Sequence, residues 1–78
     1  MMSDQQLWCA DTTLRLAIEI AAKETGQQYQ DIFRDIVNSP AYDALYDEST
    51  GLWGDGPGYL LDYWRRVLTA KTEGNENP

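Results

Sequence analysis

The segment Tyr29-Gln-Asp-Ile-Phe-Arg-Asp-Ile-Val37 decides the fold class, because its apolar side chains recur at steps of three and four residues. This spacing is typical of one face of an amphipathic α-helix and has few competing interpretations. The segment before it, Leu14-Arg-Leu-Ala-Ile-Glu-Ile-Ala-Ala-Lys-Glu-Thr-Gly26, has the same periodicity and ends on glycine, which closes many helices in the left-handed conformation. The two patterns predict consecutive helices over residues 4–24 and 27–38.

The first helix begins with a capping signal. Ser3 is followed three residues later by Gln6, the spacing of a capping box. Asp11 and the two threonines after it leave open a break inside this helix, but residues 14–24 are helical in either case. The predicted buried stripe of this helix consists of Leu7, Ala10, Leu14, Ala17, Ile18 and Ala21.

Two further helices are predicted downstream. Ser39 and Pro40 supply an N-cap residue and a proline at the first helical position, which predicts a short helix over residues 40–46. Pro57 begins a last helix over residues 57–70. The side chains expected on the buried faces of the later helices are Tyr29, Ile32, Phe33, Ile36, Val37, Tyr42, Leu45, Tyr46, Leu60, Leu61, Trp64, Val67 and Leu68.

Residues 47–56 carry loop chemistry, because glycines cluster at their end and continue into the last helix. We expect one ordered glycine-rich loop there, with Leu52 and Trp53 folded back onto the core. The fold class is therefore all-α, a small array of about four helices. It forms a single helical domain over residues 1–71, followed by a disordered tail over residues 72–78.

Composition limits the classes of partner. The 78 residues include 13 acidic and 6 basic side chains, a net charge of -7, which opposes direct binding to nucleic acid and favours a basic protein surface. The single cysteine excludes an internal disulfide, and no apolar run approaches the roughly 20 residues that span a bilayer. The N-terminus lacks the basic and apolar regions of a secretion signal. We expect a cytoplasmic protein that binds no membrane.

The side chains that most catalysis needs are missing. There is no histidine, the commonest general base and transition-metal ligand. Cys9 lies beside Trp8 in an apolar stripe, a context that favours a packed thiol over a nucleophile. The run from Asp47 to Asp55 fails the calcium-loop pattern, because Leu52 occupies the position that requires glycine. We expect no enzyme activity, no cofactor and no metal site.

The most informative stretch lies between Arg34 and Arg65, where no basic residue occurs. Acids and aromatic residues alternate there in the least regular part of the chain, where binding residues often lie. The predicted partner-binding residues are Tyr42, Asp43, Tyr46, Asp47, Glu48, Trp53 and Asp55, which we call the acidic–aromatic face. In the competing interpretation the aromatic rings belong to the core and the acids only solvate the loops. Exposed aromatic rings could also seat a second copy of the chain, so a homo-oligomer stays open.

Several of these segments resemble a family of small bacterial helical proteins of unknown function. The resemblance covers residues 14–68 and rests on the run ending at Gly26, on Asp31-Ile-Phe33, on Tyr42-Asp-Ala-Leu-Tyr46, and on Leu52-Trp53 with Tyr59-Leu-Leu61. Members are often encoded beside an ADP-ribosyltransferase-like protein, which implies a toxin–antitoxin arrangement. The family more usually has a histidine-containing loop where this chain has Gly51-Leu-Trp-Gly54, and no catalytic residue is implied.

These observations lead to two functional hypotheses. In the first, the chain is an acidic protein-interaction module, antitoxin-like or regulatory, that binds a protein partner with a basic surface through the acidic–aromatic face. In the alternative, it is a phage-type inhibitor that mimics nucleic acid and blocks a nucleic-acid-binding complex. The four arginines weaken the alternative because they interrupt the acidic field.

Overall fold

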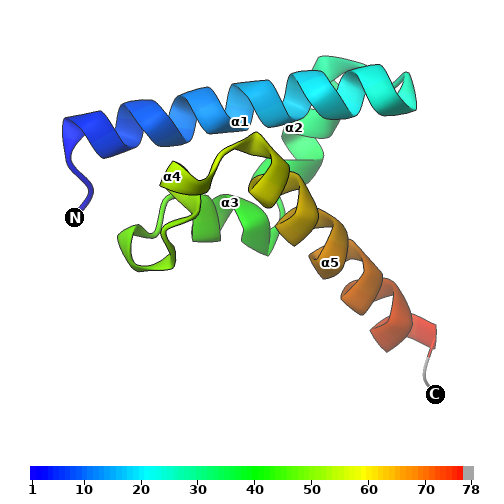
Figure 1. Cartoon of the computed structure of the whole chain (residues 1–78). Coiled ribbons are helices and arrows are strands. Elements are labelled where there is room, and N and C mark those ends of the chain that lie inside the picture. The colour runs from blue at the N-terminus through cyan, green and yellow to red at the C-terminus, as the bar shows by residue number, and fades with distance from the viewer. Residues whose placement is uncertain (77–78) are drawn as a thin grey trace.

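The chain is all-α, as the sequence predicts. The computed structural model describes the backbone of residues 1–76 and the side chains of residues 1–69. In chain order the elements are α1 (Asp4–Thr25), α2 (Tyr29–Val37), α3 (Pro40–Leu45), the 3₁₀ turn η1 (Glu48–Thr50), α4 (Leu52–Asp55) and α5 (Pro57–Glu76). In Figure 1, α1 runs along the top of the molecule, and α3 and α4 lie below it. Helix α5 starts below α1 and projects away from the other helices.

Helix α1 runs without interruption, so the break left open near Asp11 does not occur. Its capping box is formed as predicted, because the Ser3 hydroxyl accepts from the Gln6 backbone N–H at 3.1 Å and the Gln6 side chain accepts from the Ser3 N–H at 2.8 Å. Thr13 is buried, and its hydroxyl donates to the Trp53 carbonyl at 3.3 Å. A β-branched residue that weakens the isolated helix therefore makes a tertiary contact that supports it.

Glycine and serine end and begin the next helices as the sequence indicates. Gly26 has a φ of 75°, the left-handed conformation expected at the end of α1. Helix α2 begins at Tyr29, two residues after the predicted start, with Gln28 as an N-cap that makes no side-chain hydrogen bond. The Ser39 hydroxyl accepts from the Ala41 N–H at 3.2 Å and donates to the Ile36 carbonyl at 2.7 Å, which joins α2 to α3.

The prediction of a glycine-rich loop over residues 47–56 is only partly right. The segment is ordered, but it folds into η1 and the single helical turn α4. Gly51, between them, has a φ of 70° and makes the left-handed turn that a residue with a side chain would adopt only with strain. Gly51 and Gly56 therefore lie at the junctions between helical elements, whereas Gly54 lies inside α4.

Helix α5 continues to Glu76, beyond the predicted end near residue 70. Threonine, glycine and asparagine near its end are poor helix formers, which is why the sequence favours an earlier end. The tail predicted for residues 72–78 includes side chains and two backbone positions outside the described residues, and its disorder stays a prediction.

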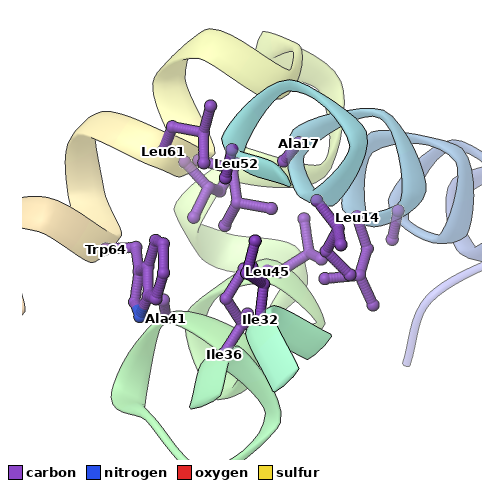
Figure 2. Packing of buried hydrophobic residues seen from close by; sticks show 13 residues of the cluster. Leu14, Ala17, Ile32, Ile36, Ala41, Leu45, Leu52, Leu61 and Trp64 are labelled. Atoms are coloured by element: carbon purple, nitrogen blue, oxygen red, sulfur yellow. The ribbon is translucent and has the colours of Figure 1, made fainter. Parts of the chain in front are cut away.

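The core is formed where the five helices converge (Figure 2). Its largest fully buried side chains are Ile18, Ile32, Ile36, Leu45 and Leu60. The predicted stripe of α1 is buried except for Leu7, which is exposed. Four residues assigned to buried faces are exposed instead, because a helical face is buried only along the length where a neighbouring helix packs on it: they are Leu7, Tyr29, Phe33 and Leu68.

Candidate functional site

The predicted acidic–aromatic face lies on α3, η1 and α4, toward the end of the molecule where the N-terminus of α1 lies (Figure 1). Helix α3 buries Ala41 and Leu45 completely. Tyr42 on this helix and Tyr46, its C-cap residue, are half-buried, with their ring centroids 4.9 Å apart and the ring planes tilted by 47°. Both tyrosines therefore pack against the core and remain partly exposed. Their part in binding a partner stays a prediction.

The Tyr46 hydroxyl is held by a residue from the first helix. It donates a hydrogen bond to a carboxylate oxygen of Asp11 on α1. Burial raises the pKa of Tyr46, and the hydrogen bond to Asp11 and the negative charge of that carboxylate raise the pKa further. The hydroxyl therefore remains protonated at neutral pH and donates to Asp11 throughout.

Asp47 is the N-cap residue of η1, and its carboxylate is held by hydrogen bonds to Ser49. One of its carboxylate oxygens accepts from the Ser49 backbone N–H at 3.0 Å and from the Ser49 hydroxyl at 2.7 Å. These two hydrogen bonds lower the pKa of Asp47, because both stabilise the charged carboxylate. Thr50 completes the turn, since its hydroxyl donates to the Ala44 carbonyl at 2.7 Å and accepts from the Leu52 N–H at 3.1 Å.

Trp53 of α4 closes this end of the molecule. Its indole N–H donates to the Glu48 carbonyl at 3.2 Å, and its own carbonyl accepts from Thr13 on α1. The side chain is half-buried and packs against the core. Trp53 therefore fixes η1 and α4 relative to α1, and part of its ring remains at the surface.

A shallow pocket of about 590 Å³ opens beside these residues. It is lined by Met1, Met2, Tyr46, Asp47, Glu48 and Ser49. The amino group of Met1 lies 3.3 Å from a Glu48 carboxylate oxygen. The pocket thus already accommodates one cation beside the Glu48 carboxylate.

The structure brings most, but not all, of the predicted residues into one network. Tyr42, Tyr46, Asp47, Glu48 and Trp53 are linked through ring contact, η1 and the pocket. Asp43 and Asp55 are exposed carboxylates on α3 and α4, and the described contacts do not join them to that network.

Sequence reasoning missed Asp11 and the two N-terminal methionines. Asp11 lies 35 positions before Tyr46, and no local signal indicates that α1 passes beside α3. The methionines carry no pattern of their own.

Charge is distributed unevenly over the molecule. The side-chain ion pairs of the described residues are Arg34 with Asp31, Arg65 with Glu24, and Arg66 with Asp62. All of them involve α2, α5 or the end of α1, and none involves a residue of the acidic–aromatic face. Among the described residues, the face is therefore negative without compensation by a basic side chain.

The described residues offer no group of three or more histidine, cysteine or acidic side chains placed to hold a metal ion. Cys9 is half-buried and is not part of a disulfide. Within the described part of the chain, no helix has the length and apolar character needed to cross a membrane.

No family model, no curated protein and no solved structure matches this chain.

Proposed function

We propose that this chain is an acidic protein-interaction module, antitoxin-like or regulatory, whose acidic–aromatic face binds the basic surface of a protein partner. The observation that carries the proposal is the segregation of charge. The carboxylates of the face lack basic side-chain partners within the described residues, whereas the described arginine pairs lie elsewhere. A basic partner would supply the missing cations.

The aromatic side chains make this surface suited to binding as well as to solubility. Tyr42, Tyr46 and Trp53 are half-buried, so each is held in place and still presents part of its ring. Tyrosine and tryptophan are enriched among residues that dominate binding energy, because they add large contact area with little loss of side-chain entropy. Rigid rings surrounded by carboxylates favour a partner that inserts arginine or lysine side chains between them.

The pocket beside Tyr46 supports the same partner chemistry. Glu48 already pairs there with the amino group of Met1, and a lysine ammonium has the same charge and hydrogen-bonding groups. Since the Met1 amino group and Glu48 are exposed, the existing pair is weak and can be exchanged for a partner's cation. Cytoplasmic location belongs to the same proposal.

Charge reversal on the face tests this proposal. Asp43 and Asp55 are the best positions, because both are exposed and neither takes part in the described hydrogen bonds. Affinity capture compares the proteins retained by three forms of the chain. These are the wild type, the double variant Asp43→Lys, Asp55→Lys, and a double control of the same charge on α2, Asp31→Lys, Asp35→Lys. We expect a protein with a basic surface to bind the wild type and the control, to be lost from the Asp43, Asp55 variant, and to dissociate as salt is raised.

Equal retention of every captured protein by the two double variants would contradict the assignment of the face. The captured protein also separates the two hypotheses. A nucleic-acid-binding protein that free nucleic acid displaces from the chain would favour the mimic, whereas one that nucleic acid leaves bound supports the interaction module.

A further inference from the structure

We propose that a second copy of this chain binds the outer face of α1 and α2, in an antiparallel pair related by a two-fold axis. We define the outer face by Leu16, Glu19, Ile20 and Lys23 of α1 and Tyr29 of α2. The α1 residues follow the spacing i, i+3, i+4 and i+7, which places them on one stripe of the helix. All five line one shallow surface pocket. This inference is independent of the function proposed for the acidic–aromatic face.

The outer face exposes apolar side chains that the core does not use. Leu16 and Ile20 are each 37% exposed and Tyr29 is 43% exposed, although Leu14 and Ile18 on the inner side of α1 already pack in the core. A helix that packs on one side only normally carries polar residues on the other. Exposed apolar residues that are grouped and bordered by charges mark interaction sites.

The order of charges on α1 favours a second copy as the occupant. Glu19 and Lys23 have opposite charges and lie one turn apart on the same stripe. In a two-fold symmetric pair every contact occurs twice, so an antiparallel arrangement centred on Ala21 places each Glu19 opposite the other copy's Lys23. The same register brings the Ile20 side chains of the two copies together near the axis. It also places Leu16 opposite the end of the other copy's α1, close to the Tyr29 that begins its α2. Apolar groups then meet apolar groups, and each charge meets its opposite.

Charge balance also separates this face from the rest of the molecule. Two chains of net charge -7 repel each other, and the repulsion is weakest where charges are already compensated. Beside the outer face Glu24 pairs with Arg65 and Asp31 pairs with Arg34. Self-association through the outer face therefore meets the least electrostatic repulsion. Because only three exposed apolar side chains contribute from each copy, we expect a dissociation constant of about 10–100 µM.

Charge complementation tests the arrangement. Sedimentation equilibrium is measured from about 1 µM to about 1 mM chain, a range that spans such affinities, for the wild type, Glu19→Lys and Lys23→Glu. Either variant alone puts like charges opposite each other at both reciprocal positions, and we expect its dissociation constant to rise by about tenfold or more. An equimolar mixture restores both opposite-charge pairs, so a heterodimer of near wild-type affinity is expected.

Controls separate this effect from folding and from overall charge. Both positions are exposed, and circular dichroism shows whether each variant keeps the wild-type helix content. Asp43→Lys makes the same charge change as Glu19→Lys, but on the acidic–aromatic face, and is expected to leave the dimer as stable as in the wild type or slightly more so. A wild-type chain that stays monomeric over the whole range, single variants that dimerise like the wild type, or a mixture that fails to recover would each overturn the proposal.

Discussion

Replacing Tyr46 by phenylalanine removes one hydroxyl group and tests the contact that ties α3 to α1. That hydroxyl donates to the Asp11 carboxylate, while the ring keeps its packing against Tyr42. A hydrogen bond to a charged group contributes about 1.5–3 kcal/mol to stability. Asp11 is exposed and Tyr46 is only half-buried, so screening by water reduces the expected loss to about 1 kcal/mol.

A loss of this size is measurable in a chain of 78 residues. It corresponds to a fall in melting temperature of about 4–8 °C for a domain of this size. Thermal and urea unfolding, followed by circular dichroism, would be measured for Tyr46→Phe, for Asp11→Asn and for the double variant. Because the two side chains act on each other, we expect a coupling free energy of about 1 kcal/mol in the double-mutant cycle.

The tyrosine also has a pH signature with a definite sign. The raised pKa of Tyr46 means that the unfolded state ionises first. Its contribution to stability is fully present below the pKa of an unfolded tyrosine, about 10, and is lost as the pH rises from there through the folded pKa. The Tyr46→Phe variant should therefore lose less of its free energy of unfolding than the wild type as the pH rises above about 10.

Tyr42→Phe is the matched control, since Tyr42 lies one turn earlier on α3 and its hydroxyl makes none of the described hydrogen bonds. This variant should lose less than about 0.5 kcal/mol, the range of an ordinary surface change. If the free-energy losses of Tyr46→Phe and Asp11→Asn simply add within about 0.3 kcal/mol, the two groups are not coupled and the contact is refuted.

Three further predictions concern stability. Ser3→Ala removes the capping box of α1 and should lower the free energy of unfolding by about 1 kcal/mol in urea titrations, whereas an unchanged midpoint would show that the cap contributes nothing. Leu45→Ala creates a cavity at a fully buried position and should cost about 2–5 kcal/mol, and a loss below about 1 kcal/mol would mean that Leu45 is not in the core. The lowered pKa of Asp47 contributes stability above the unfolded pKa of about 3.9 that is lost as the pH falls through the lower folded pKa. Asp47→Asn should therefore weaken the acid dependence of the melting temperature, and an identical acid dependence in the variant would contradict the hydrogen bonds to Ser49.

Helix positions followed from signals within a few residues of each other. The Ser3 and Gln6 pair, Gly26 at the end of α1, and Ser39 with Pro40 all act through hydrogen bonds or dihedral preferences over one turn. Such local effects are the same in any fold, so the sequence alone is enough to identify them.

Short elements and the width of the buried helical faces were harder to predict from the sequence. The single turn α4 is too short to form alone, and it depends on the contact of Trp53 with Thr13, which lies 40 positions away. Phe33 and Tyr29 fit the apolar periodicity of α2, yet each remains 43% exposed. Periodicity gives the direction of a helical face, but the width that is buried depends on how closely the neighbouring helices approach.

The predicted face shows the same division. The local pairs, Asp47 with Ser49 and Trp53 with Glu48, lie within a segment that the sequence singled out by its acids and aromatic residues. Asp11, which holds Tyr46, comes from another helix and carries no local signal.

By itself, the sequence determined the all-α class, the main helices, most of the core and the acidic segment, because periodicity, caps and charge are properties of neighbouring residues. The tertiary structure decided which side chains are half-buried, which carboxylate meets Tyr46, and where charges stay uncompensated. These features depend on distances between helices that are far apart in the chain, and no local pattern encodes such distances.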